Sequence, residues 1–303
     1  MPEFSIIWYT NSIIKYLWIL FIYLRTGCNV LEIAEIIKRA LQEDIGSGDV
    51  TTMATVPAGT SRRAELVAKE DFTLAGLDVA RQVFTTLDPD VAFEPLKFDG
   101  NKVQSGDVLA WIKGDARILL QGERVALNLL QRMSGVATTA ARFVAAVAHT
   151  DAIIVDTRKT TPGLRVLEKY AVRMGGAQNH RTSLYDGVLI KENHIAAAGG
   201  ISAAIAGARR SVPHTLKIEV ETETLDDVRE ALAAGADIIM LDNMTLEQMS
   251  EAVALIGSKA VTEASGGVNL DTVADIAATG VNLISVGALT HSSRATDISM
   301  LFR

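Results

Sequence analysis

The sequence predicts an α/β fold, in which a parallel βα barrel follows a small α+β domain. Two observations lead to this prediction. After residue 150, six short apolar runs each lead into a helical pattern, and polar residues recur where these runs end. Near-continuous apolar strands that alternate with amphipathic helices indicate a parallel sheet covered by helices, either a barrel or a doubly wound sheet. We favour the barrel because its strand ends converge on one face, where the sites of barrel enzymes lie.

Length and composition restrict the class of protein. With 303 residues, 49% hydrophobic and 21% charged, the chain is typical of a globular protein larger than one ordinary core. The single cysteine, Cys28, excludes an internal disulfide and a thiolate metal cluster, and we expect a cytoplasmic protein. The net charge of −7 argues against nucleic-acid binding. Residues 117–191 nevertheless hold 11 Lys and Arg against 5 Asp and Glu, which favours a local anion site.

The N-terminal segment differs in composition from the rest of the chain. In residues 4–24, 16 of 21 side chains are apolar, but the uninterrupted run from Tyr16 to Leu24 is too short to span a bilayer. No signal-peptide cleavage site follows it. Two interpretations of residues 1–28 stay open: an extension foreign to the protein, from a start codon assigned too early, or a helix that contacts a membrane or packs at an interface. We do not favour membrane contact by residues 4–24.

The first domain is predicted to mix helices with short strands. Residues 31–41 place their apolar side chains mostly on one helical face. Between residues 62 and 120, the β-prone runs AELVA, FTLAGL, VAFEPLKF and VLAWI are separated by turn signals such as Asp99-Gly100. From Gly122 to His149 the pattern is helical again.

The barrel strands are predicted from six apolar runs. They are IIVDT near Ile153, GVLIK near Gly187, LKIEVE near Leu216, DIIMLD near Asp237, VTEAS near Val261 and NLISVG near Asn282. Helices are expected after Thr224, after Thr245 and before Gly280. The polar residues expected at the strand ends are Asp156, Lys191, Glu219, Asp242, Ser265 and Gly287.

A group of cationic and titratable side chains is expected to meet at the face formed by these strand ends. Its members are Arg158, Lys159, His180, Arg181 and Lys191. Arginine binds carboxylate and phosphate groups bidentately and lysine acts as a point charge, so the set suits a ligand that carries both groups. A surface ion pair is the competing interpretation for any single member, and the grouping favours a site.

Acidic and glycine-containing segments complete this predicted site. Glu219 and Asp242 are expected to end adjacent strands, where their carboxylates would share a Mg²⁺ ion or neutralise nearby lysines. Ser265-Gly266-Gly267 and Val286-Gly287-Ala288 follow the last two strands, where barrels build phosphate sites from backbone amides. For Ser265-Gly266-Gly267 an ordinary turn is the alternative.

The histidines do not indicate a metalloprotease or a hydrolase. The five histidines, His149, His180, His194, His214 and His291, include no HExxH pair, and the chain has no GxSxG motif. We predict that His194, within IKENH, is a structural hydrogen-bonding residue.

Several motifs together resemble one family. They are EDIGSGDVTT (43–52), ER-x-x-LN-x-L (123–130), DTRKTTPGLRVLEKYAV (156–172), GGAQNHRTSLYDGVLIKENHI (175–195), IEVE (218–221), LDN (241–243), ASGGV (264–268) and VGALTHS (286–292). The sequence resembles the quinolinate phosphoribosyltransferases, also called nicotinate-nucleotide pyrophosphorylases (carboxylating), over about residues 30–303. Residues 1–28 have no counterpart in the resemblance.

The resemblance implies a domain organisation. An open α+β sandwich, residues 29–135 joined by the C-terminal segment 289–303, would accompany an incomplete six-stranded barrel, residues 136–288. Two chains would form a homodimer in which the sandwich of one subunit caps the barrel of the other. Arg124 would then reach into the neighbouring site.

The resemblance also implies an activity. The enzyme would transfer the phosphoribosyl group of phosphoribosyl pyrophosphate to quinolinate with decarboxylation, giving nicotinate mononucleotide, pyrophosphate and carbon dioxide for NAD biosynthesis. The residues implied to hold quinolinate and the phosphates are Thr157, Arg158, Lys159, His180, Arg181 and Lys191. Glu219 and Asp242 would lie on the ribose and magnesium side and act in catalysis with Lys159 and Lys191. The 5-phosphate would rest on Ser265, Gly266, Gly267, Val286, Gly287 and Ala288.

Three alternatives and two departures from the family pattern accompany this interpretation. The alternatives are a molybdenum-linked paralogue that acts on another heteroaromatic acid, a lyase with Lys191 as Schiff-base residue, and a binding protein without activity. Ala177 stands where the family usually has a third glycine, and Thr182-Ser183 replaces a more common apolar-Gly pair. We expect the methyl group of Ala177 to be tolerated unless its backbone needs a positive φ.

Overall fold

A computed structural model describes residues 30–303, so the interpretations of residues 1–28, including membrane contact, lie outside the described residues. No helix within residues 30–303 is both long and apolar enough to cross a bilayer. The described chain packs as two compact units. The first contains residues 30–134, 162–170 and 295–303, and the second contains residues 135–161 and 171–294. The packing of residues 162–170 with the first unit was not predicted from the sequence, and the domain limits given above stay predictions.

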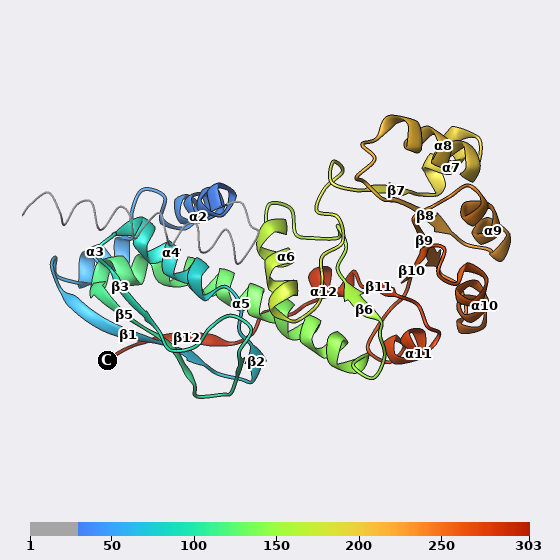
Figure 1. The fold of residues 1–303 in the computed structure, drawn as a ribbon. Coiled ribbons are helices and arrows are strands. Elements are labelled where there is room, and N and C mark those ends of the chain that lie inside the picture. The colour runs from blue at the N-terminus through green and yellow to red at the C-terminus, as the bar shows by residue number, and fades with distance from the viewer. Residues whose placement is uncertain (1–29) are drawn as a thin grey trace, which may run out of the picture. The chain divides into compact units, whose positions relative to one another are not determined.

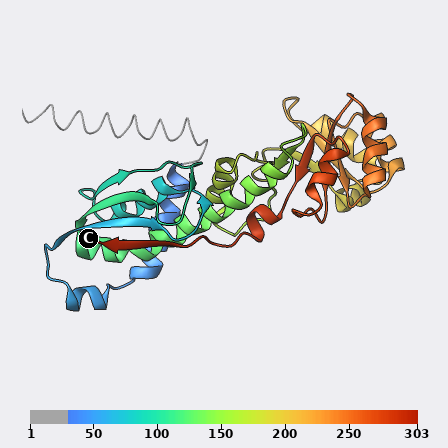
Figure 2. The ribbon, with the colours of Figure 1, turned by 90° about the horizontal axis from the view of Figure 1, so that it is seen from below.

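The first unit is built on an antiparallel sheet. Its strand order is β12-β1-β5-β3, and β2 and β4 pair separately. The C-terminal strand β12 lies beside β1 (Figure 2). The strands are β1 (Ser61–Ala68), β2 (Phe72–Thr73), β3 (Ala92–Pro95), β4 (Lys102–Val103), β5 (Val108–Asp115) and β12 (Ile298–Phe302). The helices are α2 (Val30–Ile45), α3 (Val50–Thr55), α4 (Leu77–Leu87) and α5 (Ala116–Ala146), of which α5 continues into the second unit.

Helix α4 was not predicted from the sequence. It begins after Gly76, whose φ of 100° is left-handed and which offers no side chain as a cap. The carboxylate of Asp99 caps the helix instead, because it accepts hydrogen bonds from the backbone N–H groups of Gly76 (2.9 Å) and Leu77 (3.0 Å). Because the cap lies more than 20 residues away along the chain, the local sequence contains no start signal for this helix.

The second unit is a parallel sheet of six strands in the order β6-β11-β10-β9-β8-β7. The strands are β6 (Ile153–Val155), β7 (Val188–Ile190), β8 (Ile218–Thr222), β9 (Ile238–Asp242), β10 (Val261–Ser265) and β11 (Leu283–Ser285). Each of the six predicted runs is therefore confirmed. Strands β6 and β7 are the two edges, and one isolated parallel bridge joins Val155 of β6 to Gln178. The fold is thus an incomplete βα barrel beside a separate antiparallel domain, as predicted.

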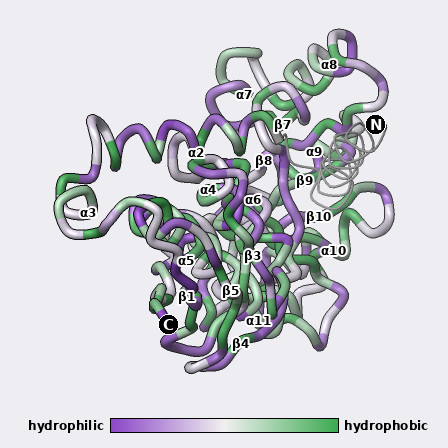
Figure 3. The backbone as a smooth tube through the Cα atoms, turned by 90° about the vertical axis from the view of Figure 1, so that its left-hand side faces the viewer, coloured by the Kyte–Doolittle hydropathy of each residue, from purple (hydrophilic) through white to green (hydrophobic). Residues whose placement is uncertain are grey.

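Helices connect the strands and cover the outside of the barrel, as α7 to α11 show (Figure 1). They are α6 (Arg165–Met174), which extends from the first unit, α7 (Glu192–Ala198), α8 (Ile201–Ser211), α9 (Leu225–Ala233), α10 (Leu246–Ile256), α11 (Val273–Ala278) and α12 (Ala288–His291). The predicted start signals of α9 and α10 are confirmed, because Thr224 and Thr245 each cap a helix with a reciprocal capping box. Hydrophilic and hydrophobic residues alternate along these segments (Figure 3), and α10 buries Met249, Ala252 and Ile256.

Candidate active site

The carboxyl ends of the barrel strands carry five of the six predicted polar residues. Asp156 and Lys191 directly follow β6 and β7, and Asp242 and Ser265 are the last residues of β9 and β10. Gly287 lies between β11 and α12, as the N-cap residue of α12. Since all neighbouring strands run parallel, these ends lie at the same edge of the sheet. The predicted convergence at one face is confirmed for these five residues.

Glu219 lies elsewhere, and the expectation that it ends its strand is wrong. It is the second residue of β8 and pairs in register with Ile238, four residues before Asp242 on β9. At ~3.3 Å per residue, Glu219 and Asp242 are about 13 Å apart along the strand direction. The two carboxylates therefore lie too far apart along the strands to share a Mg²⁺ ion directly, which was one of their two predicted roles. Glu221 points to the same face as Glu219, because side chains alternate along a strand, and it lies nearer the strand end.

Glu221 was missed by the sequence analysis although the IEVE motif contains it. Its carboxylate forms an ion pair with the ammonium group of Lys191, the residue that follows β7. The backbone N–H of Lys191 donates to Nδ1 of His194 (3.0 Å), which confirms His194 as a structural hydrogen-bonding residue. The alternation of side chains on β8 was the signal that could have identified Glu221.

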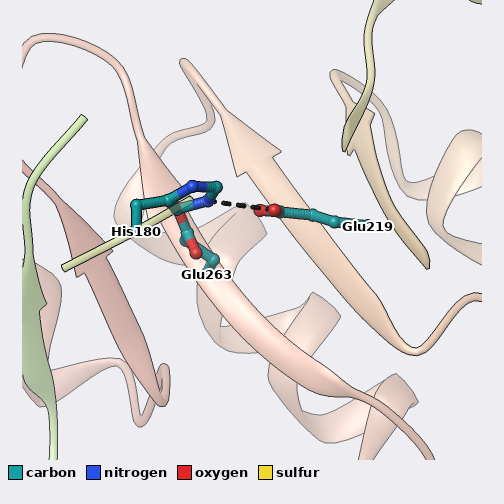
Figure 4. A group of neighbouring side chains, drawn as sticks. All are labelled: His180, Glu219 and Glu263. Atoms are coloured by element: carbon teal, nitrogen blue, oxygen red, sulfur yellow. Dashed lines mark ion pairs between the residues drawn. The ribbon is translucent and has the colours of Figure 1, made fainter. Parts of the chain in front are cut away.

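Beneath this edge lies a buried group of His180, Glu219 and Glu263, which we call the buried triad (Figure 4). Nε2 of His180 is 3.0 Å from Oε2 of Glu219 and 3.5 Å from Oε1 of Glu263. Both carboxylates are almost fully buried, and the side chain of His180 is 13% exposed. The sequence analysis did not select Glu263, because a glutamate within the apolar run VTEAS gives no local sign of a partner on another strand.

Burial raises the pKa of Glu263 to about 8, and the neighbouring charge of Glu219 adds to the rise. At neutral pH the Glu263 carboxyl group is therefore largely protonated. This protonation limits the repulsion between two carboxylates that share one buried space. Oε1 of Glu219 and both carboxyl oxygens of Glu263 make no hydrogen bond among the described residues, so acceptors outnumber donors in the buried triad.

Asp156 fixes the segment that carries His180. It is fully buried at the end of β6, and its two carboxylate oxygens accept from Nδ2 of Asn179 and from the backbone N–H of His180, both at 2.8 Å. The guanidinium group of Arg173 in turn bonds to Oδ1 of Asn179. The predicted strand-end aspartate thus supports neighbouring residues of the site with both of its carboxylate oxygens.

Arg158 and Arg181 lie close enough to influence each other. Burial lowers the pKa of Arg181, and the charge of Arg158 lowers it further. Nε of each arginine is buried and has no hydrogen-bond partner among residues 30–303, while Nη1 of Arg181 donates to the carbonyl of Gly187 (3.0 Å). Two neighbouring cations with unused donors favour an anionic ligand.

Lys159 lies next to the glycine loop after β11. A Cβ atom at Gly287 would come within 3.1 Å of Cδ of Lys159. The carbonyl of Lys159 accepts from the hydroxyl of Thr290 (2.8 Å), and its N–H donates to Oγ1 of Thr157 (3.0 Å). These contacts bring predicted residues from the loops after β6 and β11 together.

The loop after β10 requires glycine at position 266. Gly266 has a φ of 94°, and a Cβ atom there would lie 2.1 Å from Oδ1 of Asn243 in the loop after β9. Gly267 also has a positive φ of 60°, with open space around it. Because β10 pairs with both β9 and β11, this loop lies between those of its two neighbours. Ser265 and Val286-Gly287-Ala288 flank the same edge.

The two departures from the family pattern fit their surroundings. Ala177 is not among the non-glycine residues with a positive φ, so its methyl group is tolerated, as expected. Gly175 does need to lack a side chain, because a Cβ atom would lie 2.4 Å from the carbonyl oxygen of Ala137. The backbone N–H groups of Thr182 and Ser183 donate to the carboxylate of Asp186, both at 2.7 Å.

Arg124 belongs to the first unit, where it lies exposed on α5. Its predicted role in a neighbouring subunit stays a prediction, as do the substrate-binding and catalytic roles of the residues above.

Comparison with known proteins identifies the family. Residues 49–134 match the quinolinate phosphoribosyl transferase N-terminal domain, and residues 136–301 match the C-terminal domain of the same family. The chain belongs to the quinolinate phosphoribosyl transferase family. It is 46% identical to a probable nicotinate-nucleotide pyrophosphorylase [carboxylating] of Bacillus subtilis, over 90% of this chain and 94% of the relative.

Further relatives agree. A mitochondrial quinolinate phosphoribosyltransferase [decarboxylating] of Nicotiana tabacum is 43% identical over 89% of this chain and 82% of its own length. The crystal structure of NadC from Streptococcus pyogenes is similar with a TM-score of 0.87 and 44% identity, over 90% of this chain and 96% of that one.

Proposed function

We propose that this protein transfers the phosphoribosyl group of phosphoribosyl pyrophosphate to quinolinate and releases carbon dioxide and pyrophosphate, which leaves nicotinate mononucleotide as the product for NAD biosynthesis. Family membership over both domains supports this function. The single structural observation that supports it best is the pair of neighbouring arginines, Arg158 and Arg181, with buried Nε donors that have no partner among residues 30–303.

The cations of the site would bind two polyanions side by side. Arg158 and Arg181 suit the two carboxylates of quinolinate, because a guanidinium group binds a carboxylate through two donors. Lys159 and Lys191, at the loops after β6 and β7, suit phosphate oxygens. Fixed cations remove the repulsion between the substrates and hold the ring nitrogen against the anomeric carbon of the ribose.

The reaction then needs no nucleophilic side chain. The ring nitrogen of quinolinate forms the new bond to the anomeric carbon, and the bond from that carbon to pyrophosphate breaks. The departing carbon dioxide leaves its bonding electron pair on the ring carbon, where the adjacent quaternised nitrogen stabilises the negative charge, and this pair then takes up a proton. The protein positions the two substrates and stabilises the charges that develop during the reaction. Positioning and electrostatic stabilisation supply most of the rate enhancement in such steps.

Magnesium is proposed to enter with phosphoribosyl pyrophosphate. Hard oxygen ligands suit this ion, and Asp242 and Glu221 supply carboxylates near the ends of adjacent strands, whereas buried Glu219 does not. When bound, the ion would neutralise charge on the leaving pyrophosphate. The loops at Ser265-Gly266-Gly267 and Val286-Gly287-Ala288 would hold the 5-phosphate through backbone N–H groups.

We further propose a homodimer with shared active sites, in which Arg124 of each subunit serves the barrel of the other. The exposure of Arg124 on α5 supports this arrangement, because the side chain is available to a partner. We propose a cytoplasmic location for the enzyme. The Schiff-base alternative loses support, since Lys191 is paired with Glu221 and an ammonium group held by a carboxylate is not a free nucleophile.

The deciding experiment is an assay with both substrates and Mg²⁺. Carbon dioxide and pyrophosphate should appear in equal amounts, and only when quinolinate and phosphoribosyl pyrophosphate are both present. Turnover of a different heteroaromatic acid with quinolinate inert would favour the molybdenum-linked alternative. Binding of quinolinate without any turnover would favour a binding protein.

A further inference from the structure

The open seam of the barrel is closed by a short segment, residues 178–181, which we call the seam segment. On one side it is fixed to β6: the N–H of Gln178 donates to Ile154 (2.9 Å), and the N–H of Asp156 donates to Gln178 (3.1 Å). On the other side, Nη1 of Arg181 donates to Gly187, the residue before β7 (3.0 Å). The seam segment therefore carries Arg181 between the two sheet edges, where the strands themselves do not pair.

The side chain of His180 holds this segment from a third direction. It reaches from the seam segment into the barrel, toward Glu219 on β8 and Glu263 on β10 (Figure 4). Its Nδ1 accepts from the backbone N–H of Arg181 (2.8 Å), so the ring proton lies on Nε2, which faces Oε2 of Glu219 at 3.0 Å. Both ring nitrogens are thus engaged by the protein itself.

We propose that Glu219 is a positioning residue that acts through His180 to hold Arg181 in place for quinolinate, and that His180 is a strut, a side chain that only supports Arg181, rather than a direct ligand of the substrate. This inference rests on the proposed function, since it assumes that Arg181 binds quinolinate. It replaces the roles predicted from the sequence for His180 and Glu219.

A metal ion is the competing occupant of the buried triad, because one ligand atom from each residue lies within 4.8 Å of the others. Two observations favour the strut. Nε2 of His180 carries the proton that a metal would have to displace, as the hydrogen bond at Nδ1 shows. The charge of Arg181 already acts on Glu219, and a nearby guanidinium group opposes a second cation.

The KM values of Glu219 variants test whether Glu219 holds Arg181 in place through His180. Glu219→Gln keeps an oxygen that accepts from Nε2, whereas Glu219→Ala removes it and should raise the KM for quinolinate roughly 10-fold, the effect of one lost charge-assisted hydrogen bond. The KM for phosphoribosyl pyrophosphate should change less than about 2-fold, because Arg181 is proposed to bind quinolinate and not phosphoribosyl pyrophosphate. Glu219→Gln should stay close to the wild type.

A matched control is available in the first unit. Glu65 is also buried and is paired with Arg303, the residue that follows the edge strand β12. Glu65→Gln and Glu65→Ala should leave the KM for quinolinate unchanged. Equal changes in both KM values for Glu219→Ala, or equal defects in Glu219→Gln and Glu219→Ala, would overturn the proposal.

A spectroscopic test on the wild-type protein covers the case in which Glu219→Ala does not fold. With ¹⁵N-labelled histidine, the His180 ring, assigned by its loss in His180→Gln, should show the Nε2–H tautomer. Saturation with phthalate, the benzene analogue of quinolinate, should leave both ring nitrogen signals in place. An Nδ1–H tautomer, ring signals that move on phthalate binding as for a direct ligand, or an Nε2 signal replaced on addition of Zn²⁺ or Mn²⁺ alone would each overturn the strut.

These outcomes separate the inference from the proposed function. A wild-type protein that does not turn over quinolinate would refute the function, whereas the tautomer in the free protein is measured without any reaction.

Discussion

The residues of the candidate site lie at two depths, at the carboxyl edge of the parallel sheet and beneath that edge. At the carboxyl edge of the sheet, the side chain of Lys191 is 48% exposed and accessible to a ligand. About two residues deeper, the carboxylates of Glu219 and Glu263 are almost fully buried beside His180. Charges interact more strongly in the deeper layer because less solvent screens them. Substitutions in the two layers should therefore produce different defects, in binding for the upper layer and in geometry or stability for the lower one.

Arg181→Ala should weaken quinolinate binding. One lost bidentate, charge-assisted contact costs roughly 1.5 to 3 kcal/mol, so the KM for quinolinate should rise about 10- to 150-fold. Steady-state kinetics with both substrates will measure the change. Arg209→Ala on α8, which removes an exposed cation paired with Asp237, is the control and should behave like the wild type. Unchanged quinolinate kinetics in Arg181→Ala would exclude Arg181 from the binding site.

Glu263→Gln should alter how stability depends on pH. The folded protein raises the pKa of Glu263 from 4.5 to about 8. Between these values the folded state binds more protons than the unfolded state, so the wild type loses unfolding free energy as the pH rises. The slope is on the order of 1 kcal/mol per pH unit at most. Glu263→Gln carries no titrating group and should lose less between pH 5 and 8.

Urea unfolding of both proteins at pH 5, 6.5 and 8 measures this difference. Parallel stability curves for the wild type and Glu263→Gln would show that Glu263 titrates normally in the folded state. The comparison with the variant removes the contributions of titrating groups remote from Glu263, which both proteins share.

At the scale of helices and strands, the sequence was most informative where the signal is local. The six barrel strands and the helices after Thr224 and Thr245 were predicted because apolar runs and capping boxes lie within a few residues. Helix α4 was missed because its cap, Asp99, is remote in sequence. Glu219 was misplaced because β8 continues to Thr222, and a strand's exact end depends on pairing with its neighbours. Glu263 was missed because its neighbours, Glu219 and His180, are remote in sequence.

Thr245→Ala should destabilise the protein through α10 alone. Its hydroxyl accepts from the N–H of Gln248 (3.3 Å) in a capping box, and loss of such a cap costs about 1 kcal/mol. Urea unfolding should show this decrease with no change in the KM of either substrate. Ser250→Ala on the same helix removes only a hydroxyl bonded to a helix carbonyl and should change stability by less than about 0.5 kcal/mol. Equal effects of the two substitutions would argue against the cap.

At the scale of the whole molecule, the residues of the proposed reaction come from both compact units. Most of the candidate residues belong to the second unit, while Arg124 belongs to the first. The sequence alone could indicate Arg124 only through the family resemblance, because its proposed target lies in another chain. A contact with another chain produces no recognisable residue pattern in the sequence of a single chain.

Complementation tests the shared site. Arg124→Ala and Lys191→Ala, each inactive alone, should regain activity when they are unfolded and refolded together. If two chains share each site and mix at random, about a quarter of the wild-type activity should return, because half of the dimers are mixed and each has one intact site. A mixture as inactive as its components would show that each chain builds its site alone.

The pairing of β12 with β1 has a consequence for synthesis on the ribosome. Residues 298–302 supply a strand to a sheet whose other members lie between residues 61 and 115. Until residues 298–302 have emerged, one edge of β1 lacks its partner and can join foreign strands. The sheet of the first unit therefore lacks β12 while the barrel residues are synthesised, and truncation before Ile298 should yield aggregates rather than a smaller soluble enzyme.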